Sequence, residues 1–267
     1  MKIGLIGCGN MGEAIVSRLA GSTPASAQSI IATDVDKAKM NKVRSRYNVR
    51  VASYIRQVVR FADAIIIAVK PKDIDAVLEA MGPYLSSGKT IISIAAGITT
   101  GYIEKRIGKN VAVIRAMPNM PAVIGEAVSS ISAGKYAAKR DVNIAKGIFS
   151  SIGDVVELNE KLVDSVTAVS GSGPAYFFYL TECLVEAAKE LGLADRIAKQ
   201  LAFKTALGSA KLLSSCGEGP AVLRARVASK GGTTEAAFRV LEKANFKGIV
   251  KRAVKRARKR SRELSKA

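Results

Sequence analysis

Short apolar runs alternate with segments of helical period along residues 1–159. This alternation is typical of βα units that build a parallel sheet covered by helices. The near-continuous apolar run at 63–70 predicts a strand that is buried on both faces. The pattern predicts helices at 11–19, 54–61, 73–81 and 138–150, and strands at 3–6, 29–34, 49–52, 63–70, 90–96, 111–117, 127–133 and 154–158.

The pattern changes near Asn159, and from residue 161 onward the period is helical with glycine or proline between segments. Helices are predicted at 163–169, 174–191, 194–214, 221–227 and 233–245, followed by a basic terminal helix. We therefore expect a Rossmann-type α/β domain over 1–159, with a mostly parallel sheet, followed by an all-α domain over 160–267. The segment 175–188 carries more apolar surface than one stripe needs, which predicts burial in a subunit interface.

A glycine motif lies directly after the first predicted strand. Gly7, Gly9 and Gly12 have G-x-G-x-x-G spacing, and a predicted helix begins at Met11. In dinucleotide-binding units the first glycine permits a tight turn, the second lets backbone approach a pyrophosphate, and the third allows close packing of helix on strand. The phosphates then lie over the helix N-terminus. We predict that Gly7, Gly9, Asn10, Met11 and Gly12 bind a dinucleotide.

An acidic residue, Asp34, follows the second predicted strand, 22 residues beyond Gly12. This is close to where an acid accepts the ribose 2′-hydroxyl of NAD, which favours NADH. Lys37 and Lys39 could offset the charge of a 2′-phosphate, however, and either Asp34 or Asp36 could simply cap the next helix. The choice between NADH and NADPH therefore stays open.

Two further segments leave the carboxyl ends of predicted strands. Ligands of open α/β sheets bind at that edge, so Ala68, Val69, Lys70 and Pro71 are candidate cofactor contacts. Asn119 lies in a proline-bounded turn after the strand at 111–117. Its side chain could orient a nicotinamide or cap the turn, and the local sequence does not separate the two.

A second glycine-rich stretch opens the predicted helix at 233–245. The consecutive N–H groups of Gly231, Gly232, Thr233 and Thr234 would form an anion-binding concavity at the helix N-terminus. A carboxylate suits such a place. The alternative is a helix start capped by serine or threonine that binds nothing.

Histidine is absent from the sequence. This excludes Ser-His-Asp hydrolysis, histidine-ligated metals and the histidine proton relay of many dehydrogenases. The three cysteines are far apart and show no zinc-type spacing, which predicts reduced thiols and no structural metal. The longest apolar stretches fall well short of the ~20 residues of a membrane-spanning helix, and the N-terminus lacks the layout of a secretory signal, so we expect a cytoplasmic protein.

The net charge is +20, and residues 247–267 hold ten Lys or Arg against one acid. Such a segment could bind nucleic acid or an anionic surface. Apolar residues recur within it at helical spacing, and no aromatic residue follows Phe246. These features favour the solvated face of an amphipathic helix, so specific nucleic-acid binding is not expected.

Five motifs together resemble the pyrroline-5-carboxylate reductase family in order and spacing: GCGNMGEAI at 7–15, AVKP at 68–71, RAMPNMP at 115–121, SGSGPAY at 170–176 and SKGGTTEAA at 229–237. The resemblance implies NAD(P)H-dependent reduction of the C=N bond of 1-pyrroline-5-carboxylate to L-proline, the last step of proline biosynthesis. It also implies a homodimer or higher homo-oligomer in which the helical domains intertwine and the partner chain completes each active site.

Mapped onto this chain, the resemblance makes the helical domain the substrate and dimerisation domain. It puts the cofactor on the first glycine loop and on 68–71, with Asn119 near the nicotinamide. The substrate is expected at Ser229, Gly231, Gly232, Thr233 and Thr234. Thr234 is our candidate catalytic residue, as hydrogen-bond or proton donor to the ring nitrogen.

The chain departs from the family pattern at Lys230, where proline is usual, at Met120, where threonine is common, and in its basic tail. An alternative with the same domain plan is a β-hydroxyacid dehydrogenase. That class should carry a lysine on the helix after its glycine-rich substrate motif, and 175–188 contains none. A deazaflavin-dependent oxidoreductase and a Rossmann-derived redox sensor that binds nucleic acid through its tail are weaker alternatives.

Overall fold

The computed structural model describes residues 1–21 and 24–264, and the chain divides into two compact units. Of the described residues, the first contains 1–21, 24–171 and 257–264, and the second contains 172–256. The first unit therefore keeps the short helical segment that follows the last strand. No strand lies within residues 160–264, but the compact units divide at 171/172, so the expected domain boundary at 159/160 stays a prediction.

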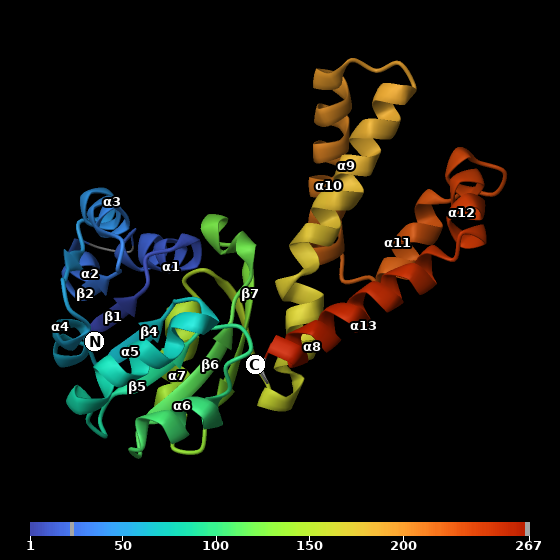
Figure 1. Ribbon diagram of the computed structural model, residues 1–267. Coiled ribbons are helices and arrows are strands. Elements are labelled where there is room, and N and C mark those ends of the chain that lie inside the picture. The colour runs from blue at the N-terminus through green and yellow to red at the C-terminus, as the bar shows by residue number, and fades with distance from the viewer. Residues whose placement is uncertain (22–23, 265–267) are drawn as a thin grey trace. The chain divides into compact units, whose positions relative to one another are not determined.

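The first unit is built on one eight-stranded sheet of order β3-β2-β1-β4-β5-β6-β7-β8 (Figure 1). Neighbouring strands are parallel throughout except for the antiparallel pair β6–β7. This confirms the expected Rossmann-type, mostly parallel sheet. The strands are β1 (Ile3–Ile6), β2 (Ile30–Thr33), β3 (Arg50–Val51), β4 (Ala64–Ile67), β5 (Thr90–Ser93), β6 (Ala112–Met117), β7 (Ala127–Ala133) and β8 (Gly153–Glu157).

Helices cover both faces of this sheet, because successive strand residues point to opposite sides. Leu5, Ile66 and Ile92 belong to one apolar core, whereas Ile6 and Ile65 belong to the other. The first core includes residues of α1 (Asn10–Gly21), α2 (Pro24–Gln28), α3 (Lys37–Tyr47) and α7 (Lys139–Phe149). The second includes residues of α4 (Ile55–Phe61), α5 (Ile74–Met81) and α6 (Thr100–Ile107).

The hydrophobic pattern did not predict α2 and α6, and it gave no bounds for α3, which was expected only as a helix that Asp34 or Asp36 could cap. The start of α6 is capped by Thr99, whose hydroxyl accepts the N–H of Tyr102 at 3.1 Å. Its end is marked by Gly108, which has a φ of +66°. A threonine before the segment and a glycine after it are ordinary helix signals, so the sequence did contain the information for α6.

The second unit is helical, and its first two helices lie along one another (Figure 1). No helix among residues 1–21 and 24–264 has the length and apolar character needed to cross a membrane. After α8 (Val163–Val166) and a π-helical turn (Thr167–Gly171) come α9 (Gly173–Glu190), α10 (Asp195–Ser215), α11 (Pro220–Val227), α12 (Thr233–Lys243) and α13 (Phe246–Leu264).

A buried ion pair ties the start of the helical segment to the sheet. Glu160 lies in the short 3-10 turn Glu160–Leu162, and Arg115 lies on β6 with only 4% of its side chain exposed. One oxygen of Glu160 accepts from Arg115 at 3.4 Å and from the Thr100 N–H at 2.8 Å. The other accepts the Thr100 hydroxyl at 2.7 Å. The carboxylate thus neutralises a buried cation and caps the N-terminus of α6.

Replacing Glu160 with alanine should lower the free energy of unfolding by about 3 kcal/mol, because Arg115 would stay buried without its counter-charge. The shift of the urea unfolding midpoint at fixed protein concentration measures this cost. The matched control is Glu157→Ala, which breaks an exposed pair with Lys146 and should cost less than about 1 kcal/mol. Equal shifts for both variants would show that the Glu160 contacts are not structural.

Candidate active site

The three glycines of the motif form the turn between β1 and α1, and they have different surroundings. Gly7 has a φ of +104°, and a Cβ there would meet the carbonyl oxygen of Ala68 at 2.5 Å. A Cβ on Gly12 would overlap the carbonyl oxygen of Gly7, whereas one on Gly9 would meet no atom within 4 Å. Gly7 and Gly12 must therefore be glycine for the protein's own backbone to pack at this turn. The space at Gly9 is open, as a site for an approaching pyrophosphate requires.

Asp34 holds this loop against the end of β2. One carboxylate oxygen accepts the Cys8 N–H at 2.6 Å, and the other accepts the Asp36 N–H at 2.8 Å. Asp36 is the N-cap of α3, and its carboxylate accepts the Ala38 N–H at 2.9 Å. Of the two caps considered from the sequence, Asp36 is therefore the one that forms. A contact of Asp34 with a ribose stays a prediction, since each oxygen keeps a second lone pair.

Cys8 lies inside the same loop and is 2% exposed. Burial, and after it the nearby charge of Asp34, raise the pKa of its thiol to about 12. The thiol therefore stays protonated near neutral pH and is not a nucleophile. Its Sγ lies 3.7 Å from the carbonyl oxygen of Thr33, as a weak hydrogen bond to the end of β2.

A cavity of about 770 Å³ opens beside Gly7 and Val69, at the carboxyl ends of β1, β2 and β4. This is the edge at which parallel α/β sheets bind ligands. The guanidinium of Arg56 stacks on the Tyr54 ring at 4.7 Å within this lining. Its charged lining residues are of both signs, so they do not settle NADH against NADPH: Asp34, Lys37, Arg56, Asp73 and Glu79.

The segment 68–71 lies against the glycine loop. The N–H of Ala68 donates to the carbonyl oxygen of Ile6 at 2.8 Å, and Pro71 begins a short 3-10 turn that ends at Asp73. Gly7 approaches both Ala68 and Val69 closely. The structure thus brings Gly7–Gly12, Asp34 and 68–71 to one place in the first unit.

Asn119 is 8% exposed and follows β6 at the same edge of the sheet. Its Oδ1 accepts the Val128 N–H at 3.0 Å, and its Nδ2 donates to the carbonyl oxygen of Ser170 at 3.1 Å. Each of its polar groups is therefore paired within the protein. A contact with the nicotinamide stays a prediction, because one N–H of the side-chain amide has a further direction to donate.

The predicted substrate residues come together in the second unit, where Gly232 is the N-cap of α12. Gly231 has a φ of +76°, and its N–H donates to Glu235 Oε2 at 2.5 Å. The Gly232 N–H donates to the carbonyl oxygen of Ser229 at 3.0 Å. Thr233 and Thr234 form the first turn of α12, where N–H groups have no acceptor in the helix. An anion bound here would meet these two amides first.

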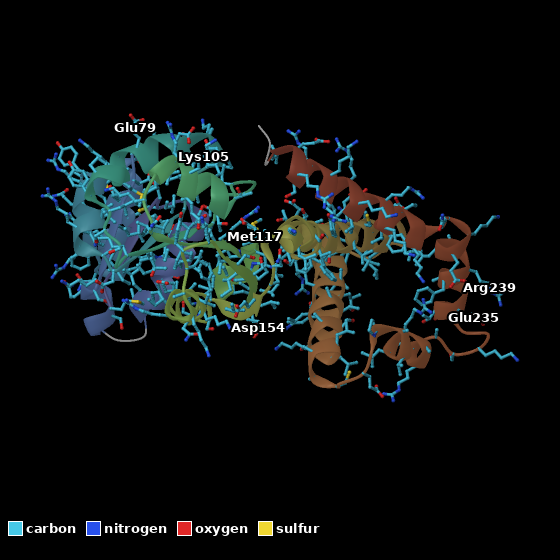
Figure 2. The ribbon with its side chains drawn as sticks, turned by 90° about the horizontal axis from the view of Figure 1, so that it is seen from below. Glu79, Lys105, Met117, Asp154, Glu235 and Arg239 are labelled. Atoms are coloured by element: carbon cyan, nitrogen blue, oxygen red, sulfur yellow. The ribbon has the colours of Figure 1, made fainter. Side chains whose placement is uncertain are left out.

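Sequence reasoning missed Glu235 as a neighbour of this loop. Its second oxygen pairs with Arg239 at 3.4 Å, and both side chains lie on α12 (Figure 2). The signal was present, because an acid at the third helical position is where a capping box places a side chain that reaches back to the N-terminus. The Gly231 N–H thus already donates to the Glu235 carboxylate, beside the place predicted for the carboxylate of the substrate.

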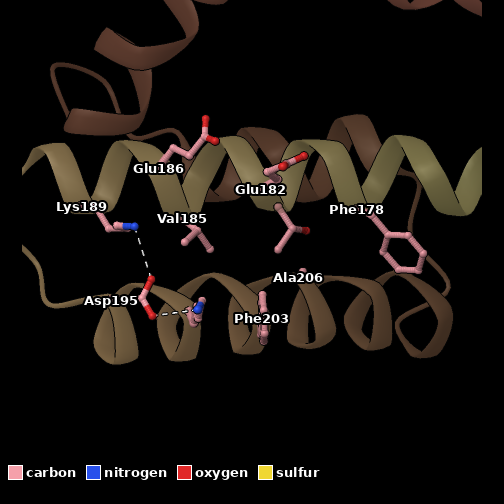
Figure 3. A pocket seen from close by; sticks show the side chains of 10 residues that line it. Phe178, Glu182, Val185, Glu186, Lys189, Asp195, Phe203 and Ala206 are labelled. Carbon is pink, nitrogen blue, oxygen red and sulfur yellow. Dashed lines mark ion pairs between the residues drawn. The ribbon is translucent and has the colours of Figure 1, made fainter.

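An apolar groove of about 780 Å³ runs between α9 and α10 (Figure 3). Phe178, Val185 and Phe203 line it, and the ion pairs of Asp195 with Lys189 and Lys199 lie at one end. Next to it, Phe177 and Tyr179 are each 69% exposed. Large apolar side chains in such number on one helix are typical of a surface that a subunit covers.

A doubly wound sheet with a glycine turn before its first helix, joined to an all-helical unit, defines the class of dinucleotide-dependent oxidoreductases. Residues 160–264 match the family described as pyrroline-5-carboxylate reductase dimerisation, and residues 2–97 match the family described as NADP oxidoreductase, coenzyme F420-dependent. The pyrroline-5-carboxylate reductase of Synechocystis is 38% identical over 266 residues, covering 100% of this chain and 99% of that protein. The chain belongs to the pyrroline-5-carboxylate reductase family.

Solved structures agree over the full length. A pyrroline-5-carboxylate reductase from Coxiella burnetii has a TM-score of 0.93 at 35% identity, covering 100% of this chain and 99% of that one. A pyrroline carboxylate reductase from Plasmodium falciparum, solved with NADP bound, has a TM-score of 0.89 at 30% identity, covering 99% and 98%. The family match to a dimerisation segment includes α9, which supports the predicted homo-oligomer.

Two glycine variants test the cofactor loop. Gly9→Ala should leave the unfolding midpoint unchanged, because its Cβ meets no protein atom, yet it should raise the Kd for NAD(P)H at least about tenfold by holding the pyrophosphate away. Gly12→Ala should lower both stability and cofactor affinity, because its Cβ would overlap the Gly7 carbonyl. Cofactor fluorescence and thermal melts measure the two effects. A Gly9→Ala protein with unchanged Kd would place the dinucleotide elsewhere.

Proposed function

We propose that this chain catalyses the NAD(P)H-dependent reduction of 1-pyrroline-5-carboxylate to L-proline. The observation that carries the proposal is its full-length similarity to reductases of that name, with the dinucleotide turn and the glycine-threonine helix start both intact. The reaction is the last step of proline biosynthesis. The cytoplasmic location stays a prediction from the sequence.

The cofactor-binding residues in this proposal are those of the first unit. The amides of Gly9, Asn10 and Met11 begin α1 and would receive the pyrophosphate. Asp34 would face the adenosine ribose, and the strand end at 68–71 would line the path toward the nicotinamide. The open space at Gly9 and the left-handed Gly7 fit such a ligand. When bound, the reduced nicotinamide supplies the hydride.

The substrate-binding residues are those of the second unit. The amides of Thr233 and Thr234, followed by that of Gly231, would receive the substrate carboxylate. Gly232 would shape this site as the N-cap of α12, because its own N–H donates to the Ser229 carbonyl oxygen. The Gly231 N–H becomes available only when Glu235 withdraws toward Arg239, its other partner. Ser229 would close the loop from the other side, since its carbonyl oxygen already holds the Gly232 N–H.

The proton chemistry needs no imidazole. A cyclic imine is basic enough to arrive protonated, so the protein must chiefly orient the electrophilic carbon and exclude water. We assign to the Thr234 hydroxyl the hydrogen bond to the ring nitrogen. Cys8 takes no part, because its buried thiol stays protonated.

We further propose that the functional assembly is a homodimer or a larger assembly of dimers, with α9 at the subunit interface. The exposed apolar residues of α9 and the match of 160–264 to a dimerisation segment support this. In this arrangement the partner chain completes each active site.

The test is proline formation by the purified protein with NADH and with NADPH, measured side by side. Thr234→Ala should lower kcat/KM about 100-fold, because the ring nitrogen loses its hydrogen-bond partner, whereas Thr234→Ser keeps the hydroxyl and should stay within a few-fold of wild type. Wild-type kcat/KM in Thr234→Ala would remove that residue's role. Absence of proline with either coenzyme would contradict the proposed function itself.

A further inference from the structure

Residues 160–171, here named the connecting segment, join the last strand to α9. They contact the rest of the first unit at three places. Glu160 binds Arg115 and the start of α6, as described above. Asp164 accepts the Ser261 hydroxyl at 2.8 Å and pairs with Arg262 at 3.7 Å. The third point is the hydrogen bond from Asn119 to Ser170. The last of these lies directly before the chain enters α9.

The π-helical turn explains why Ser170 can receive this bond. Its hydroxyl donates to the Val166 carbonyl at 3.1 Å, which closes the turn on itself. Carbonyls at the end of a helical segment lack partners within the helix, and Asn119 supplies one for Ser170. π-helical turns of this kind are frequently found at functional sites.

Gly171 completes the junction by close packing. A Cβ on Gly171 would lie 3.3 Å from the terminal methyl of Met117, a residue at the end of β6 that is labelled in Figure 2, so a larger residue at 171 would press on that side chain. Asn119 follows Met117 by two residues and is held from its other side by the Val128 N–H. The junction needs both a donor and an acceptor at position 119, and among side chains of this size only an amide offers both without charge.

We propose that Asn119 is a positioning residue, which acts through the main chain of Ser170 and Gly171 to fix where the polypeptide leaves the sheet and enters α9. The inference rests on the proposed function. Hydride transfer requires reacting atoms about 3 to 3.5 Å apart, and a displacement of about 1 Å can cost about 100-fold in rate. Because α9 is proposed to lie at the subunit interface, a displaced start of α9 would move the groups that the partner chain brings to the site, which would lower turnover and leave cofactor affinity intact.

This prediction differs from that of a direct cofactor contact. If Asn119 orients the nicotinamide, its loss should raise the Kd for NAD(P)H. If it positions the chain, its loss should lower kcat while the Kd stays within about twofold of wild type, because the pyrophosphate loop lies elsewhere on the sheet.

The experiment is Asn119→Asp in the full chain. Aspartate keeps an acceptor for the Val128 N–H but replaces the donor with an oxygen that repels the Ser170 carbonyl. The matched control is Asn159→Asp, the same chemical change at an exposed cap whose oxygen still accepts the Lys161 N–H. Gly171→Ala is a second variant that disturbs the same junction from the opposite side.

We expect kcat to fall about 100-fold in Asn119→Asp and to fall in Gly171→Ala, with unchanged Kd for NAD(P)H, while Asn159→Asp behaves as wild type. Unchanged kcat in Asn119→Asp, or a Kd that rises as much as kcat falls, would overturn the inference. Should Asn119→Asp fail to fold by circular dichroism, unchanged kcat in Gly171→Ala would overturn it. Loss of proline formation by the wild type would instead contradict the proposed function.

Discussion

The structure depends on a close contact between the first strand and the first helix. The chain must turn out of β1 and enter α1 in so little space that Gly12 touches the carbonyl of Gly7, and Gly7 in turn lies on the carbonyl of Ala68. This contact sets the N-terminus of α1 at the edge where β1, β2 and β4 end. The amides of α1 can receive a phosphate only because no side chain fills that space.

The glycine loop after β1 is held by backbone and carboxylate groups, and the loop of the predicted substrate residues is held in the same way. Asp34 binds the Cys8 amide in one unit, and Glu235 binds the Gly231 amide in the other. Both carboxylates lie at turns whose N–H groups attract anions. A protein without histidine can therefore organise a reduction from amides, hydroxyls and carboxylates, with the hydride coming from the cofactor.

The central strands β1, β2, β4 and β5 could be predicted from the sequence because every residue in them is buried, which gives short, mainly apolar runs. The glycine turn was equally readable, since its spacing reflects local geometry. Contacts between residues that are distant in the sequence could not be predicted in this way. Asn119 meets Ser170 across 51 positions and Glu160 meets Thr100 across 60, and no local pattern encodes either pairing. The missed helix α6 is different, because Thr99 and Gly108 marked its ends.

The basic terminal helix also gained a structural contact that its composition did not reveal. Ser261 and Arg262 near its end bind Asp164 of the connecting segment, and Arg260 pairs with Glu263. These contacts return the end of the chain to the first unit. Specific nucleic-acid binding stays unexpected on the sequence grounds given above.

The central claim is that the β1–α1 turn receives the pyrophosphate of the coenzyme. A crystal structure of the protein with NADPH bound tests it most directly. We expect the pyrophosphate oxygens to lie within hydrogen-bonding distance of the amides of residues 9–11, over the first turn of α1. A pyrophosphate bound away from that turn would contradict it.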